Sequence, residues 1–196
     1  MTVKINCDTS DGLKLESDTS GAIDIQSAGV TKVSIDAVGN LDIQGQYSGK
    51  GNSPYFHVYM SASQTVTNNT WVKATYNTVE FESGVTFDTT NSKFVVPSGQ
   101  GGLYQMNVIH AFSGSANTTV RQCYLRHYLN GTAVNFRPLA NFDANYVRQT
   151  TLNINKIVNL SAGDEVEMYG FINVSSGTPK FEGAGSSSWS MFKLIT

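Results

Sequence analysis

From residue 55 to the C-terminus, apolar and polar residues alternate along runs that are separated by short segments rich in Gly, Asn, Ser and Pro. Alternation with a period of two places the apolar side chains of a strand on one face, whereas a surface helix repeats its apolar residues every three or four positions. No segment between the runs has the helical pattern, so the sequence predicts an all-β sandwich or barrel. The predicted strands are 55–60, 75–82, 103–112, 120–129, 150–160, 165–174 and 189–195.

Two of these runs indicate which side chains face the core. Along 103–112, Met106 and Val108 share the face that carries most of the apolar residues, so we expect both in the core. Along 120–129, one face points inward or toward a partner subunit; its members are Cys123, Leu125, His127 and Leu129. The opposite face carries Tyr124, Arg126 and Tyr128. The dipeptide Asn130-Gly131 then predicts a hairpin turn, because both residue types tolerate a positive φ.

The first 46 residues have a different pattern. Between Leu13 and Gly45 an apolar–polar–apolar triplet recurs, and each copy is followed within a few residues by Gly, Asn or Ser. One chain offers too little apolar surface here to close a core, so we expect three chains to share these strands about an axis. The alternative is an N-terminal pair of hairpins folded against the main domain. The triplets are Leu13-Lys14-Leu15, Ile23-Asp24-Ile25, Val33-Ser34-Ile35 and Leu41-Asp42-Ile43.

Three regions follow from this change of pattern. Residues 1–46 are predicted to form a β-repeat stalk, and residues 47–54, rich in Tyr, Ser, Gly, Lys and Asn, a linker. Residues 55–196 are predicted to form the head.

The charge of the chain argues against several classes of partner. The formal net charge is -2, the isoelectric point is about 5.9, and Lys and Arg form no stripe, so we expect no nucleic-acid partner. The sequence has no long apolar run and no apolar leader after Met1. We therefore expect that the chain is made in a cytoplasm and that it does not insert into a membrane. Cys7 and Cys123 lack a metal-ligand spacing, and both are predicted to be free thiols.

Residues suited to catalysis or metal binding are sparse. His57, His110 and His127 lie inside alternating runs, and the sequence contains no nucleophile elbow, zinc-protease motif or phosphate-binding loop. We therefore predict no enzymatic activity, no cofactor and no metal site. Two metal hypotheses stay open: three copies of His127 around a threefold axis, and calcium at 141–145 or 162–165, where turn formation already explains the Asn and Asp residues.

A series of motifs follows in order from residue 78. It consists of an apolar strand, an aromatic-Asp pair, a Phe before a Pro-containing turn, and a Gly-x-Tyr that opens a long strand. These are Thr78-Val79-Glu80-Phe81-Glu82, Phe87-Asp88, Phe94-Val95-Val96-Pro97 and Gly102-Leu103-Tyr104. Further motifs are Tyr128-Leu129-Asn130-Gly131 and Ala162-Gly163-Asp164-Glu165-Val166. In this order they resemble the globular head of complement-component and tumour-necrosis-factor-type proteins, although residues 188–192 depart from that family's closing Ser-Gly-Phe pattern. The resemblance implies a trimeric, ten-stranded jelly roll whose first and last strands are neighbours.

The N-terminal triplets are similar to the short β-repeats that precede head domains in tailed-phage fibre proteins. Together the two resemblances imply a virion structural protein, a trimeric short fibre or spike at the particle surface, made in the cytoplasm of the bacterial host. Its N-terminal segment would dock to other virion proteins, and its head would present loops to a host glycan or protein. One alternative is a capsid or tail decoration protein without a receptor, and a remote one is a bacterial surface adhesion head. The predicted receptor-contact residues are Ser113, Asn117, Asn141, Asp143, Asn145, Tyr146, Ser175 and Ser176.

Overall fold

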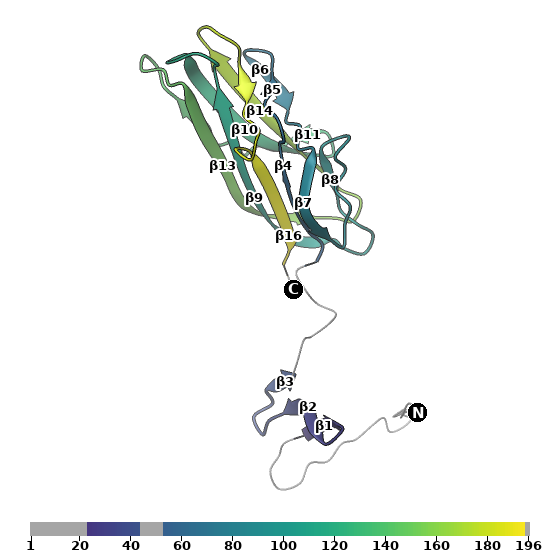
Figure 1. The fold of residues 1–196 in the computed structure, drawn as a ribbon. Coiled ribbons are helices and arrows are strands. Elements are labelled where there is room, and N and C mark those ends of the chain that lie inside the picture. Colours follow the sequence, from purple (N-terminus) through teal and green to yellow (C-terminus); the bar gives the residue numbers. More distant parts are fainter. Residues whose placement is uncertain (1–22, 44–52, 195–196) are drawn as a thin grey trace. The chain divides into compact units, whose positions relative to one another are not determined.

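The computed structural model describes residues 23–43 and 53–194 and divides the chain into two compact units, 1–51 and 52–196 (Figure 1). We call them the N-terminal unit and the head. The division falls inside the segment 47–54, most of which lies outside the described residues. The role of the N-terminal residues as a stalk and docking segment stays a prediction.

Every element in the described part of the chain is a β-strand, so the all-β prediction is confirmed, and no helix there could span a membrane. The N-terminal unit contains β1 (Ile23–Ser27), β2 (Val30–Ile35) and β3 (Leu41–Ile43). The head contains β4 (Tyr55–Tyr59), β5 (Gln64–Thr65), β6 (Thr70–Lys73), β7 (Thr78–Ser83), β8 (Lys93–Val95), β9 (Gly102–Ser113), β10 (Val120–Leu129), β11 (Thr132–Ala133), β12 (Leu139–Asn141), β13 (Gln149–Leu160), β14 (Glu165–Val174), β15 (Lys180–Phe181) and β16 (Ser188–Lys193).

The described part of the N-terminal unit is an antiparallel sheet of β1, β2 and β3. Three of the four predicted triplets lie in these strands, and the triplet at 13–15 lies outside the described residues. The sheet leaves much of its apolar surface uncovered, since Ile25 is 57% exposed, Val30 55% and Leu41 62%. Apolar strand residues left in water favour a partner that covers them.

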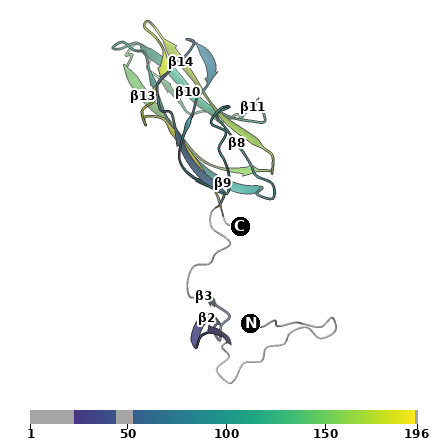
Figure 2. The same cartoon turned by 45° about the vertical axis from the view of Figure 1, so that its right-hand side comes forward.

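The head consists of two antiparallel sheets whose strands run along its length (Figures 1 and 2). In the first sheet β9 is central: β13 pairs along one edge, and β16, followed by β4 and β7, along the other. Two-residue β15 pairs with the far end of β9 and with β5. In the second sheet β14 lies between β10 on one side and β6 and β8 on the other, while β11 and β12 pair with the outer edge of β10.

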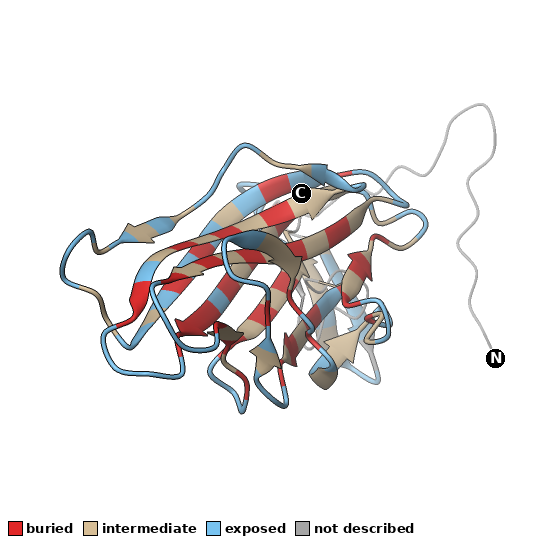
Figure 3. Cartoon of the chain, turned by 90° about the horizontal axis from the view of Figure 1, so that it is seen from above, coloured by how far each residue is buried: buried red, intermediate tan, exposed pale blue. Residues whose placement is uncertain are grey.

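The core lies between the two sheets and is rich in aromatic rings. Trp189 of β16 is completely buried and packs edge-on against Phe56 and Phe87 at 5.1 and 5.4 Å between ring centroids. Such pairs add stability beyond the area that they bury. Buried and more exposed residues alternate along the strands (Figure 3), as a two-residue period requires.

The predicted orientation of the two central strands is confirmed. Met106 and Val108 are buried in the core. Of the inward face predicted for β10, Cys123, Leu125 and His127 are buried and Leu129 is partly buried. The side chains of Tyr124, Arg126 and Tyr128 are on the opposite face and are partly exposed.

The predicted hairpin at Asn130-Gly131 is also present. The two residues join β10 to β11 and have φ angles of 50° and 73°. Positive φ at both central positions is the geometry of the tight turn whose twist matches that of the paired strands.

Candidate functional site

The chain enters and leaves the head at the same end, which we call the base. Near the start of the head, the Pro54 carbonyl accepts a hydrogen bond from the Lys193 amide at 3.0 Å, and Leu194 donates to the Leu103 carbonyl at 2.8 Å. Leu103 lies at the start of β9, and the 12 residues of that strand span roughly 36 Å. The loops that adjoin Ser113, at the other end of β9, are therefore at the far end of the head from the base (Figure 1).

Three loops meet at this far end, and we call them the distal loops: 114–119, 142–148 and 175–179. Thr119 donates its amide hydrogen to Val147 at 3.1 Å and accepts one from Ser175 at 2.9 Å. The Thr178 amide donates to the Ser115 hydroxyl at 2.9 Å. The predicted receptor-contact residues lie in three separate stretches of the sequence, and the fold brings these stretches together.

The predicted receptor-contact residues differ in their exposure. Tyr146 is partly buried, and Ser113 is buried at the end of β9, where its hydroxyl donates to the Glu182 carboxylate. That bond, with a second from Ser63, holds the pKa of Glu182 below its ordinary value. The Ser113 side chain is therefore not presented to a partner. The exposed members are Asn117, Asn141, Asp143, Asn145, Ser175 and Ser176, and receptor contact by them stays a prediction.

Two shallow hollows open among the distal loops. One, of about 390 Å³, is lined by Thr118, Ala144, Asn145 and Tyr146. The other, of about 180 Å³, is lined by Arg121, Gln122, Asn141, Asp143 and Asn173. The Arg121 guanidinium lies 5.3 Å from the centre of the Tyr146 ring and so connects the two. Sequence reasoning missed Arg121, Gln122 and Asn173 because they lie in strands rather than in loops.

Backbone geometry holds these loops in uncommon conformations. Ser115, Thr118 and Asp143 all have positive φ angles, of 58°, 52° and 43°. Such conformations cost free energy for residues other than glycine and persist where the surrounding structure fixes them. The distal loops therefore have a defined shape, which a recognition surface requires.

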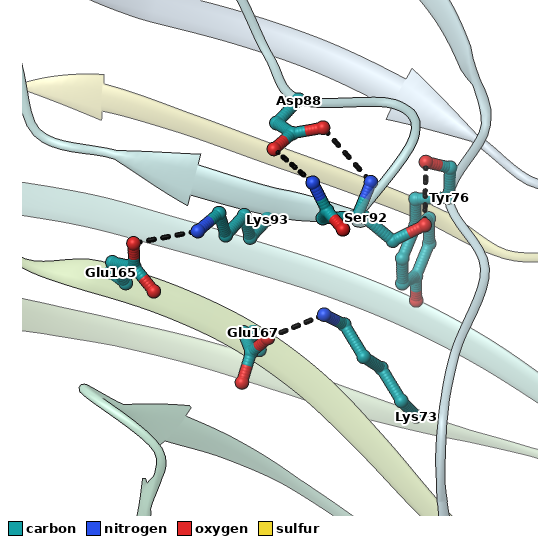
Figure 4. Close-up of polar contacts among 8 residues, drawn as sticks. Lys73, Tyr76, Asp88, Ser92, Lys93, Glu165 and Glu167 are labelled. Atoms are coloured by element: carbon teal, nitrogen blue, oxygen red, sulfur yellow. Dashed lines mark hydrogen bonds and ion pairs between the residues drawn. The ribbon is translucent and has the colours of Figure 1, made fainter.

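The outer face of β14 carries two ion pairs (Figure 4). Lys93 contacts Glu165 at 2.6 Å, and Lys73 contacts Glu167. The hydrogen bond that Lys93 donates to Glu165 is the main reason that the pKa of Lys93 is raised. Next to these pairs, Asp88 accepts hydrogen bonds from Asn91 and closes the turn before β8. Because these charges neutralise each other locally, we infer that the side chains stabilise the fold and do not bind a ligand.

The outer face of the first sheet is the second exposed feature of the head. Phe81 is 54% exposed, Ile109 49% and Ile157 53%, although all three lie in strands. Around them are polar residues such as Asn153, which pairs with Ile109. Large apolar side chains on a strand face mark a surface suited to association with another protein.

The histidines form no catalytic constellation. His110 is fully buried, its Nδ1 lies 2.9 Å from the Tyr76 hydroxyl, and burial lowers its pKa to about 3. Burial and nearby Lys156 lower the pKa of His127 to about 4. His57 lies 2.7 Å from the carboxylate of Glu80 at the surface.

His127 lines a hollow of about 200 Å³ that is otherwise mostly apolar. Its position relative to a threefold axis stays untested. No group of three or more His, Cys, Asp or Glu residues that could hold a metal ion occurs within 23–43 and 53–194.

Comparison with known proteins gives the fold of the head but no sequence family. No family model matches the chain, and no curated protein matches its sequence. The globular domain of zebrafish complement 1qA protein superposes with a TM-score of 0.52 at 15% identity, over 73% of this chain and 98% of that one. The head is a jelly roll of the complement-head and tumour-necrosis-factor type.

Two further structures support this assignment of the fold. Eiger TNF from S. frugiperda superposes with a TM-score of 0.51 at 12% identity, over 72% of this chain and 94% of that one. Murine APRIL superposes with a TM-score of 0.51 at 11% identity, over 72% of this chain and 98% of that one. Identities this low establish the fold alone, so the resemblance predicted from the motifs is confirmed at the level of the fold.

Proposed function

We propose that the chain is a structural protein of a tailed-phage particle, a trimeric short fibre or spike at the virion surface that attaches to the host. Its N-terminal unit docks to other virion proteins, and its head contacts a glycan or protein of the host. The observation that carries this proposal is the difference between the two ends of the head (Figure 1). The chain enters and leaves at the base, and the three distal loops, whose backbone conformations are fixed, lie at the opposite end. A base that is tethered leaves the distal loops free to meet a partner.

Two exposed apolar surfaces support the trimeric part of the proposal. In the N-terminal unit, Val30 and Leu41 are exposed, and in the head, Ile109 and Ile157 on the first sheet are exposed as well. Copies of the same chain would cover such surfaces, as in closed symmetric assemblies. The resemblance of the head to a family of trimeric proteins points the same way.

The experiment that tests attachment is binding of the purified full chain to candidate host cells, with competition against adsorption of the phage. We expect saturable binding that Asn145→Ala and Tyr146→Ala weaken. Ser98→Ala, an exposed change in the turn before β9 at the base, is the matched control and should leave binding unchanged. Absence of saturable binding to any host that the phage infects would overturn the attachment function.

A decoration protein is the second candidate, and the small size of the N-terminal unit favours it. Its described strands have three to six residues each, too short to extend a head far from a particle. Particles that lack the protein would then adsorb normally but lose resistance to heat. We propose no catalytic role in either case, and release of glycan fragments during incubation would contradict that.

A further inference from the structure

An aromatic row crosses the outer face of the second sheet. The strand register places Trp71 of β6 beside Phe171 of β14, Phe171 beside Tyr124 of β10, and Tyr124 beside Leu139 of β12. The ring centroids of Trp71 and Phe171 are 5.7 Å apart, and those of Phe171 and Tyr124 are 5.3 Å apart. Leu139, at the end of the row, is 55% exposed. Four strands thus contribute one continuous apolar strip to the surface.

A row of amides borders this strip on the side of the distal loops. The register places Gln122 of β10 beside both Asn141 of β12 and Asn173 of β14. These three amides line the hollow of about 180 Å³ described above, together with Arg121 and Asp143. Amide groups that face an open hollow can donate and accept hydrogen bonds to a polar ligand.

Three of the four arginines of the chain lie on this face, each over an aromatic ring. The Arg126 guanidinium is 3.8 Å from the centre of the Trp71 ring, and that of Arg137 is 5.1 Å from the centre of the Tyr124 ring. Arg121 lies over Tyr146, as described. Among the ion pairs of the described residues, none joins these arginines to a carboxylate.

The positive charge of this face is therefore not neutralised by pairing. The lysines of the same sheet contrast with the arginines, because Lys73 and Lys93 are paired with Glu167 and Glu165. Asp143 is the carboxylate that shares the hollow with Arg121. A chain with a net charge of -2 thus concentrates unpaired guanidinium groups beside its aromatic row.

We propose that this outer face of β6, β14, β10 and β12 binds an acidic glycan of the host surface. A sugar ring has an apolar C–H face that packs on aromatic side chains and a rim of hydroxyls that amides can bind. A guanidinium recognises the carboxylate or phosphate of an acidic sugar with paired hydrogen bonds. The proposal rests on the proposed attachment function and names the chemical class of its receptor.

Single-stranded nucleic acid is the rival ligand, since its bases also stack on aromatic rings beside arginine. Its phosphates carry a charge at every nucleotide, and such a ligand is bound in a positively charged groove along its length. Here the carboxylate of Asp143 lies in the hollow on one side of the aromatic row, and Glu167 lies beside Tyr128 on the other side. A ligand with sparse negative charge fits this border better.

The test measures binding of the purified full chain to polysialic acid and alginate, with neutral dextran and a single-stranded oligothymidine as comparison probes, at low and high salt. We expect the acidic polysaccharides to bind, dextran to bind at least tenfold more weakly, and Arg126→Gln to lower the affinity about tenfold. Arg137→Gln, in an exposed loop, is the second variant. Lys32→Gln removes one exposed positive charge from β2 of the N-terminal unit, outside the head, and is the matched control that should leave glycan binding unchanged.

Any of the following results would overturn this inference. Equal binding of dextran and acidic glycans would show that the arginines do not contribute to recognition. Tighter binding of oligothymidine would favour single-stranded nucleic acid as the ligand. A change in oligomeric mass of the Arg126 or Arg137 variants would assign the face to a second copy of the chain. If no acidic polysaccharide binds while host cells still bind saturably, the glycan class is wrong and the attachment function stands.

Discussion

The buried histidine His110 makes the stability of the head depend on pH in a defined direction. Burial lowers its pKa from 6.5 to about 3. Between these values the unfolded chain binds a proton that the native chain does not, so the free energy of unfolding falls as the pH is lowered. One pKa unit corresponds to about 1.4 kcal/mol. Lowering the pH from 7.5 to 5 goes about one and a half units below the unfolded pKa, so His110 alone removes about 2 kcal/mol of stability.

Urea unfolding at both pH values and one protein concentration measures this contribution. We expect wild type to lose about 2 kcal/mol more than His110→Gln between pH 7.5 and 5, because other titrating groups are common to both and cancel. His110→Leu is a second variant without the imidazole, and we expect the same difference from wild type. Tyr76→Phe removes the hydrogen bond to Nδ1 but leaves the ring buried, so it should keep the full pH dependence. An identical pH dependence in wild type and both His110 variants would contradict a contribution of His110 to the loss of stability.

Three further changes test the packing of the head. A methyl group at Gly170 would lie 2.6 Å from Phe181, so Gly170→Ala should destabilise the head by about 1–3 kcal/mol in urea unfolding, and less than additively when combined with Phe181→Leu. Gly131 has a φ of 73°, so Gly131→Ala should lower the free energy of unfolding by about 1 kcal/mol in the same assay. Gly131→Asn should cost less, because Asn tolerates a positive φ, and an equal cost for both variants would contradict the need for a left-handed backbone conformation. Cys123 is buried and burial raises the pKa of its thiol, so in a Cys7→Ser background it should react with a thiol reagent only after unfolding; rapid reaction in the native state would contradict its placement.

The long strands could be predicted from the sequence because alternation is a local property. β10 and β14 have the predicted bounds, and β9 and β13 differ from prediction by one residue at one or both ends. The prediction for 75–82 began too early, because β7 starts at Thr78. Short strands left no such signal: two-residue β15 exists because it pairs with Ser113 and Phe112 of β9, which lie far away in the sequence.

The candidate sites illustrate the same difference. Tyr124 and Arg126 were correctly predicted to face away from the core, since their own strand determines that. That Trp71 and Phe171 lie beside them depends on the register of three strands, which sequence periodicity does not encode. Ser113 was predicted as a receptor-contact residue, yet it is the last residue of β9, where its buried hydroxyl donates to Glu182.

The proposed function depends most on a trimeric assembly. Three copies would cover the exposed apolar residues of the N-terminal unit and of the first sheet, and would present the distal loops together. Light scattering of the full chain at micromolar concentration tests it directly. We expect a mass three times that of the 21.2 kDa chain. A mass of 21.2 kDa that persists as the concentration is raised would contradict it.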